Sequence, residues 1–196
     1  MAGIIKVNQY QDFNGNTLFT SDGSGNITPG SLNIADAQIA SNAAISTTKL
    51  GTGAVLQVKQ QAFSNLSTTS TSYASIGSLS ITPNSASNKI LITTLNHIYV
   101  NSYSTDTWRG AFQKVLRDST ELLSDGTGGY GEGAFFVGNS DRYMCYSSLH
   151  YLDSPNSTSA VTYDMQVRSR VSGVNVNFNN SSYGSGGRMI LMEIAG

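Results

Sequence analysis

The chain has 196 residues, of which 39% are apolar and 12% are charged, and its formal net charge is −1. That length suits one compact domain with a smaller appendage, and the sparse, balanced charge excludes a surface that attracts nucleic acid or anionic membranes. Ser, Thr, Asn and Gly supply the missing polarity. Because these residues are poor in helix interiors, the composition predicts a β protein.

Cysteine content and hydropathy limit where the chain acts. Cys145 is the only cysteine, so an intramolecular disulfide and a cysteine zinc site are both excluded, and we interpret it as a small buried apolar residue. Residues 1–10 lack the apolar centre of a secretory signal, and no later segment has the ~20 apolar residues that span a bilayer. We expect a chain made in the cytosol that leaves the cell, if at all, within a larger particle.

The first region in chain order, residues 1–53, is predicted to be an extended attachment arm that ends at Gly51–Gly53. Asn14-Gly15 in its turn-rich beginning predicts a small hairpin with a type I′ turn. Between Leu32 and Leu50 the apolar residues lie five or six positions apart, which fits neither a helix nor a strand, so they are expected to pack on the body or on a neighbouring subunit. A partly disordered N-terminus is the alternative. The candidate partner-contact residues of the arm are Ile4, Ile5, Val7, Ile34, Ile39, Ile45 and Leu50.

Alternating apolar and polar residues dominate the second region, residues 54–196. The segment 161–171 predicts a strand with one wet face, and the alternation resumes at 174–179, so the two segments are interpreted as a hairpin with outward-facing asparagines. The strands predicted for this body are Leu56–Phe63, Tyr73–Ile81, Ile90–Val100, Trp108–Arg117, Gly133–Val137, Arg142–Leu152, Val161–Val171, Val174–Asn179 and Arg188–Ile194.

About nine strands with turn signals between them, and no convincing helix, predict an all-β antiparallel sandwich. A jelly roll is the leading topology, and an immunoglobulin-like sandwich is the alternative. The predicted organisation is therefore an N-terminal arm followed by a jelly-roll-like body.

Enzyme motifs receive little support. His97 and His150 both fall within predicted strands, where a structural or surface role is expected, and no nucleophile elbow of the form G-x-S-x-G occurs. Residues 126–131 satisfy G-x-G-x-x-G, but a strand rather than a helix follows them, so we interpret them as a surface loop.

The carboxylates do not suggest a catalytic pair or a metal site either. They lie mostly in turn contexts, where aspartate caps its own backbone. We expect no enzyme, no cofactor and no bound metal. The carboxylates interpreted as turn-forming include Asp22, Asp118, Asp125, Asp141 and Asp153.

Aromatic residues beside loops are the remaining candidates for recognition, because flat rings stack on sugars and anchor protein contacts. Trp108 stands at a predicted strand start, and Tyr130 and Tyr183 stand in glycine-rich loops. These three are the candidate host-contact residues.

Several segments resemble short virion structural proteins of tailed bacteriophages, especially those of marine and cyanobacterial hosts. They include IIKVNQYQDFNGNTLFTSDGSGNIT, IADAQIASNAAISTTKLGTGAVLQVKQ, STTSTSYASIGSLSITPNSASNKILI, LRDSTELL, LDSPNSTSAVTYDMQVRS and the final RMILMEIAG, and together they cover nearly the whole chain. The resemblance implies an N-terminal segment before a compact β-sandwich, and it provides no catalytic residues.

Within that class the resemblance implies a virion location and two competing roles. The first is a capsid decoration or cement protein that binds the shell through its arm and stabilises it. The second is a short tail fibre or receptor-binding tip that contacts host glycan. A lectin-like secreted module lies outside the class. We expect a homotrimer that assembles with capsid or tail proteins, because subunit contacts would stabilise a chain that has no disulfides.

Overall fold

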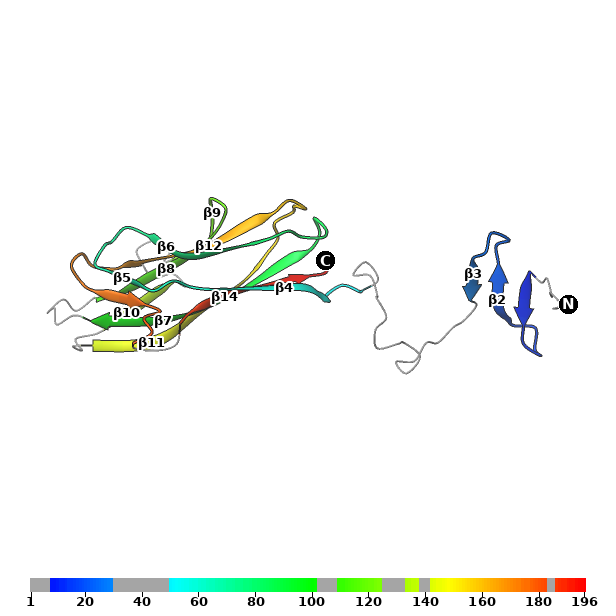
Figure 1. Ribbon diagram of the computed structural model, residues 1–196, viewed down its shortest axis with the longest axis horizontal. Helices are drawn as coiled ribbons and strands as arrows, with labels where there is room; N and C mark the ends of the chain where they lie inside the picture. Colours follow the sequence, from blue (N-terminus) through cyan, green and yellow to red (C-terminus); the bar gives the residue numbers. More distant parts are fainter. Residues whose placement is uncertain (1–7, 30–49, 102–108, 125–132, 138–141, 183–185) are drawn as a thin grey trace. The chain divides into compact units, whose positions relative to one another are not determined.

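The computed structural model describes residues 8–29, 50–101, 109–124, 133–137, 142–182 and 186–196 (Figure 1). All regular secondary structure in these residues is β-strand, and the chain divides into two compact units, Met1–Ser46 and Thr47–Gly196. We call them the N-terminal unit and the body.

The N-terminal unit contains an antiparallel sheet in the order β1-β2-β3, made of β1 (Gln9–Gln11), β2 (Thr17–Ser21) and β3 (Ile27–Pro29). In the loop between β1 and β2, Asp12 Oδ1 accepts hydrogen bonds from the backbone N–H groups of Asn14 at 2.9 Å and Asn16 at 2.8 Å. Gly15 has a φ of 81°, whereas Asn14 is not in the positive-φ region. The predicted hairpin is present, but the type I′ turn is wrong, because that turn needs positive φ at both central residues.

The loop between β2 and β3 repeats this construction. Asp22 Oδ1 accepts from the backbone N–H groups of Ser24 at 2.7 Å and Asn26 at 3.2 Å, and Asn26 Nδ2 donates to Asp22 Oδ2 at 2.6 Å. Gly25 again lies in the left-handed region, with a φ of 92°. Both loops therefore follow the pattern Asp-x-x-Gly-Asn, in which the aspartate caps the loop and glycine permits the left-handed residue.

The body is an antiparallel β-sandwich of two sheets. The five-stranded sheet has the order β10-β8-β12-β6, with β9 on β8, and its strands are β6 (Ala74–Ile81), β8 (Arg109–Arg117), β9 (Thr120–Leu123), β10 (Ala134–Val137) and β12 (Val161–Ser169). The six-stranded sheet has the order β4-β14-β7-β13-β5, with β11 on β7, and its strands are β4 (Val55–Ala62), β5 (Leu66–Thr68), β7 (Lys89–Asn101), β11 (Arg142–Asp153), β13 (Val176–Phe178) and β14 (Arg188–Ile194).

The hydrophobic core lies between these two sheets (Figure 1). Alternate residues of β7 and β12 point into it, as expected for strands with one buried face. The all-β, jelly-roll-like sandwich predicted from the sequence is confirmed. Its most deeply buried apolar side chains include Ile76, Ile81, Ile90, Ile92, Ile98, Val115, Tyr163, Met165, Phe178, Met189 and Leu191.

The predicted hairpin of segments 161–171 and 174–179 is wrong. β12 belongs to the five-stranded sheet, whereas β13 pairs with β5 and β7 in the other sheet, so the chain crosses between layers near Gly173. Asn177 lies opposite Tyr99 on the outer side, as expected, and donates to Asn175 Oδ1 at 2.7 Å. Asn179 departs from the expectation, because it is buried and donates to Asn96. Alternation shows which residues share a face, but it does not show which sheet a strand joins.

Candidate interaction surface

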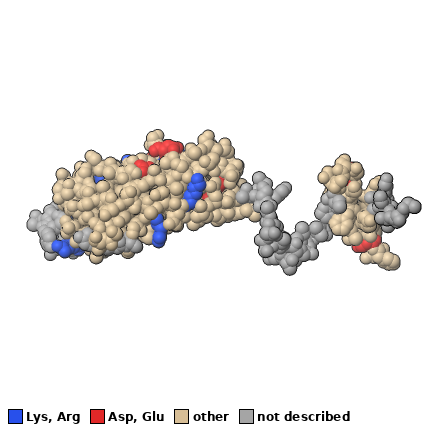
Figure 2. Space-filling model, viewed as in Figure 1, with Lys and Arg blue, Asp and Glu red and all other residues tan. Residues whose placement is uncertain are grey.

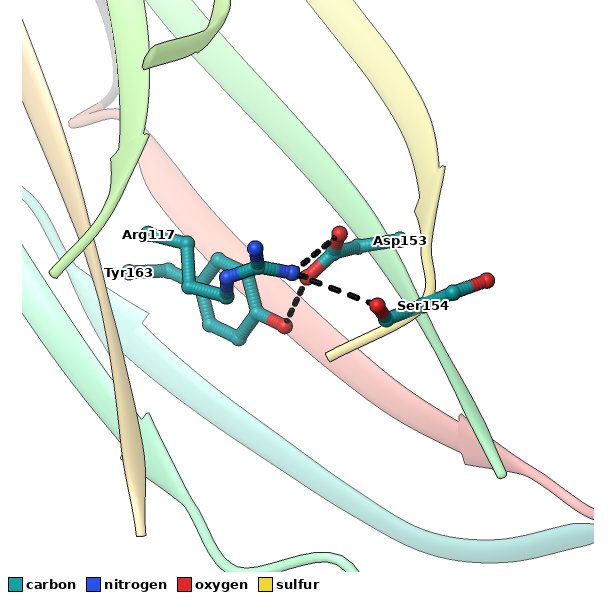
Figure 3. Close-up of polar contacts among 4 residues, drawn as sticks. All are labelled: Arg117, Asp153, Ser154 and Tyr163. Carbon is teal, nitrogen blue, oxygen red and sulfur yellow. Dashed lines mark hydrogen bonds and ion pairs between the residues drawn. The ribbon is translucent and has the colours of Figure 1, made fainter. Parts of the chain in front are cut away.

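A charged cluster joins the two sheets inside the body (Figure 3). Arg117 Nη1 of β8 lies 2.8 Å from Asp153 Oδ1 at the end of β11, and Tyr163 of β12 donates its hydroxyl hydrogen to Asp153 Oδ2 at 2.7 Å. Burial, followed by the bond to Asp153, raises the pKa of Tyr163 above its usual range. Asp153 is 4% exposed, so its interpretation as a turn-capping residue is wrong; it is part of the core's internal bracing.

Glu193 of β14 forms a second buried carboxylate cluster. It accepts hydrogen bonds from Gln57 Nε2 at 2.6 Å, from Asn84 N at 2.6 Å and Nδ2 at 3.0 Å, and from Asn88 Nδ2 at 2.6 Å. These four donors occupy both carboxylate oxygens and tie the segment between β6 and β7 to β14. The arrangement satisfies a buried charge, and its contacts are those of a structural group.

A third polar group crosses the sandwich near its middle. Asn96 Nδ2 of β7 donates to Gln113 Oε1 of β8 at 2.8 Å, and Gln113 Nε2 donates to Ser147 Oγ of β11 at 2.7 Å. Asn179 Nδ2 donates to Asn96 Oδ1 at 3.2 Å. All of these bonds connect protein groups to one another, so this cluster also serves the fold.

The outer faces of the two sheets differ in chemistry. On the five-stranded sheet, the outward residues of β12 are Thr162, Asp164, Gln166 and Arg168, and the neighbouring outward residues of β6 are Ser78 and Ser80. This is the polar outer face that an antiparallel sandwich normally turns to water.

The outer face of the six-stranded sheet over β4, β14, β7 and β11 is mixed: an apolar row crosses it, while Gln60, Thr93, Ser148 and His150 also point outward. We call this region the apolar face after that row. Cross-strand register places Val58, Met192, Leu91 and Leu152 in one continuous row across all four strands. Val58 is 58% exposed and Leu152 is 50% exposed, so the row ends in large apolar side chains that water reaches. Other outward residues of the apolar face are Leu95, His97, Tyr99, Met144, Tyr146, Ile190 and Ile194.

His97 lies within the apolar face beside Tyr146, with ring centroids 5.3 Å apart in an edge-on arrangement. Its side chain is buried and burial lowers its pKa, so the neutral form is favoured. His150, the other histidine, is exposed and contacts Ser148 and Thr93 through its ring nitrogens. Neither histidine is placed beside a carboxylate in these contacts.

Charged side chains are few and scattered on the visible side of the body (Figure 2). On the apolar face the charged residues of the described strands are Lys89, Arg142 and Arg188, and each is the first residue of its strand. Lys89 and Arg142 lie at the two ends of β7, whereas Arg188 lies opposite Leu95, near the middle of that strand.

The N-terminal unit presents a second exposed apolar surface. Tyr10 of β1 is opposite Phe19 of β2, and they are 55% and 43% exposed. Phe13 at the first loop is fully exposed, and Leu18 is 47% exposed. None of the side chains described between Gln9 and Thr28 is buried. The described side chains therefore give this three-stranded sheet no buried face, and a sheet of this size is stable only when one of its faces is covered.

Most sequence-predicted site residues lie outside the described residues. These are Ile4, Ile5, Val7, Ile34, Ile39 and Ile45 of the arm and the aromatic candidates Trp108, Tyr130 and Tyr183. Leu50 is described: it belongs to the body, is 42% exposed, and lines a shallow hollow with Leu56 and Ala195. We did not predict the apolar face from the sequence. Segment 188–194 has apolar residues at both its inward and its outward positions, and this was a signal for it.

No three His, Cys, Asp or Glu side chains among the described residues gather closely enough to hold a metal ion. No described helix is long and apolar enough to cross a membrane. Cys145 is half-buried and packs against the core, and burial raises the pKa of its thiol to about 11.

Comparison with known proteins gives neighbours by structure alone. No family model matches the chain, and no curated protein matches it. A structure of the Gx strain of infectious bursal disease virus superposes with a TM-score of 0.45 and 9% identity, covering 71% of this chain and 33% of the viral one. Dimeric latent PorU from Porphyromonas gingivalis gives a TM-score of 0.44 and 12% identity, covering 74% of this chain and 14% of PorU.

A third neighbour is the T13 particle of infectious bursal disease virus, with a TM-score of 0.42, 8% identity, and coverage of 69% of this chain and 30% of the viral one. The chain thus spans about a third or less of the length of these neighbours. Likeness at this level does not assign a function.

Proposed function

We propose that this chain is a non-enzymatic virion structural protein of a tailed bacteriophage, assembled as a homotrimer. In this proposal it is a capsid decoration protein whose N-terminal unit binds the shell and whose body projects from it. The assignment to a phage rests on the sequence resemblance, and the attachment role rests on the structure of the N-terminal unit.

The observation that carries the attachment role is the absence of a buried side chain among those described in β1, β2 and β3. The two Asp-x-x-Gly-Asn loops fix the path of the backbone through hydrogen bonds within each loop. Apolar side chains such as Tyr10 and Phe19 are then held outward on a defined sheet. Burying these rings against another protein would supply the stabilisation that the small sheet lacks.

The body suits a repeated surface component for two reasons. Its sandwich is braced internally by buried polar clusters, so it does not depend on disulfides. Its charged side chains are few, which reduces repulsion between many copies placed close together.

The experiment uses particles and a point variant of the full chain. Tyr10→Ser combined with Phe19→Ser removes the paired rings, and we expect loss of incorporation into particles. The matched control, Thr20→Ser with Thr28→Ser, changes a neighbouring exposed cross-strand pair and should incorporate normally. Incorporation of both proteins at equal levels would refute the attachment role of this unit.

Immunogold labelling of intact particles with an antibody against the body distinguishes the two locations. Label distributed over the heads supports the decoration protein. Label confined to the tail would instead support the alternative role, a short tail fibre or receptor-binding tip that contacts host glycan. Absence of label from purified particles would overturn the virion assignment.

A further inference from the structure

We infer that the apolar face of β4, β14, β7 and β11 is the surface through which copies of this chain bind one another. This inference rests on the proposed homotrimer and names its contact surface. It does not depend on the location of the protein in a particle.

The first argument is the contrast between the two outer faces of one body. The five-stranded sheet turns Thr162, Asp164 and Gln166 outward, as a solvated sheet does. The six-stranded sheet turns an uninterrupted row of apolar side chains outward across four of its strands. A row of large apolar side chains with half-exposed ends is typical of a surface that another protein covers.

The second argument is size. β7 and β11 run side by side for 13 and 12 residues, and β14 and β4 extend the face for 7 and 8 residues. With strands ~4.8 Å apart and a rise of ~3.3 Å per residue, the face projects an area of roughly 600 Å². Side-chain relief makes the accessible surface larger than this projection. The area is therefore comparable to the ~800 Å² that each partner buries in a standard stable interface.

The third argument is symmetry and charge. In a closed trimer the three copies of this face surround one symmetry axis, so each face contacts surfaces of its two neighbours. Lys89 and Arg142 lie at the two ends of the face, and Arg188 adds one charge opposite Leu95, at the end of β14. Polar groups at a rim around an apolar centre are the usual anatomy of an interface.

The regular edge of the sheet agrees with this placement. β11 pairs with β7 over all twelve of its residues, and no register shift interrupts the ladder. Met144, Tyr146 and Leu152 therefore stay on the same side along the whole strand. Ser148 and His150 lie between Tyr146 and Leu152 on that side, so the margin that a second copy would cover is apolar toward its two ends.

The test is the mass of the purified full-length chain in solution. Sedimentation velocity of the wild-type protein should show two or more chains per particle, with three expected. Val58→Glu with Leu152→Glu places a charge at each end of the apolar row, at positions already half exposed or more. We expect the dissociation constant to rise about 30-fold or more, because association would bury unpaired charge.

One control variant and the circular dichroism spectrum separate loss of the contact from loss of folding. Ser80→Glu adds the same charge to the polar outer face, on an exposed residue of β6, and should leave the oligomer intact. Met144→Glu tests the other end of the apolar face with a single exposed substitution. All variants should keep the wild-type circular dichroism spectrum.

Three results would overturn the inference. They are a monomeric wild-type chain at micromolar concentration, an oligomer that survives Val58→Glu with Leu152→Glu, and an oligomer that dissociates equally in Ser80→Glu. A wild-type monomer would mean that a different protein or the chain's own residues 1–46 cover the face. None of these results bears on the particle labelling, so failure of this inference is distinguishable from failure of the virion assignment.

Discussion

Tyr163 of β12 and Asp153 of β11 are joined by a hydrogen bond of 2.7 Å that links the five-stranded sheet to the six-stranded sheet (Figure 3). Arg117 Nη1 completes the arrangement, at 2.8 and 2.9 Å from the two oxygens of the same carboxylate. A buried carboxylate costs free energy unless it is paired and hydrogen-bonded. The three side chains therefore depend on one another.

Removing the hydroxyl of Tyr163 should weaken this bracing. Tyr163→Phe keeps the ring in the core but leaves Asp153 Oδ2 with one partner fewer. We expect the free energy of unfolding to fall by about 1.5 kcal/mol, the usual value for a bond to a charged group. Urea denaturation measures this change. Tyr151→Phe on β11, the strand of Asp153, is the control. An equal loss in both variants would show that the bond from Tyr163 contributes nothing specific.

Gly187 and Gly186 offer a matched pair of adjacent glycines. A Cβ at Gly187 would lie 2.4 Å from the carbonyl oxygen of Leu95 and 2.3 Å from Asn179 Oδ1, whereas a Cβ at Gly186 meets open space. Gly187→Ala should therefore destabilise the body by about 2 kcal/mol or more, and Gly186→Ala by less than about 0.5 kcal/mol. Thermal unfolding compares them. Similar midpoints for both variants would contradict the close approach at Gly187.

His97 should make stability depend on pH below neutrality. Burial lowers its pKa from the ordinary value of 6.5, so as pH falls below 6.5 the unfolded chain takes up a proton that the folded chain resists. The free energy of unfolding then decreases, by at most about 1.4 kcal/mol per pH unit for one proton, and the effect is absent above the unfolded value. Its described neighbours are the Tyr146 ring and Asn179, which are both uncharged.

The measurement for His97 is the free energy of unfolding, from chemical denaturation at several pH values between about 5 and 8, the range in which histidine ordinarily titrates. His97→Phe should flatten the decline on the acid side, while His150→Gln should leave it unchanged because His150 is exposed. A decline of equal slope in wild type and His97→Phe would assign it to other groups.

The aspartates of the two N-terminal loops should respond to acid in a different range. Hydrogen bonds from Asn26 and Ser24 lower the pKa of Asp22 below its ordinary value of 3.8. Capping by the carboxylate is therefore complete above that value and is lost as pH falls through the lowered pKa. Amide chemical shifts of Ser24 and Asn26, followed by NMR, should titrate together. Asp22→Ala should abolish this titration and leave that of the Asp12 loop in place.

The strand positions of the body could be predicted from the sequence, and the reason is physical. Inward residues such as Val161 and Met165 alternate with outward Thr162 and Asp164, and period-two burial leaves this signature in any single strand. All nine segments predicted for the body contain a strand. β5 and β9 were missed because β5 contains one apolar residue and β9 has its two leucines side by side, so neither strand alternates.

Features that depend on the partner strand could not be predicted. Segment 174–179 lies in the sheet opposite to that of its predicted hairpin partner. The prediction failed because alternation within a strand does not identify the neighbouring strand. Asp153 is followed by Ser154 and Pro155, which resembles a turn, yet it binds Arg117, 36 positions away in sequence. The apolar face emerged only when cross-strand register brought Val58 and Leu152 into one row.

The bonds that run from Asn96 to Gln113 and from Gln113 to Ser147 have a consequence for how the chain finds one structure. A shift of two residues in the register of neighbouring strands keeps every apolar side chain on the same face of the sheet. Hydrophobic burial alone therefore leaves several registers nearly equal in free energy. In a slipped alignment these amides would face hydrocarbon without partners, at a cost of about 1–3 kcal/mol for each group. The hydrogen bonds among Asn96, Gln113 and Ser147 therefore favour one alignment of β7, β8 and β11 over alignments shifted by two residues.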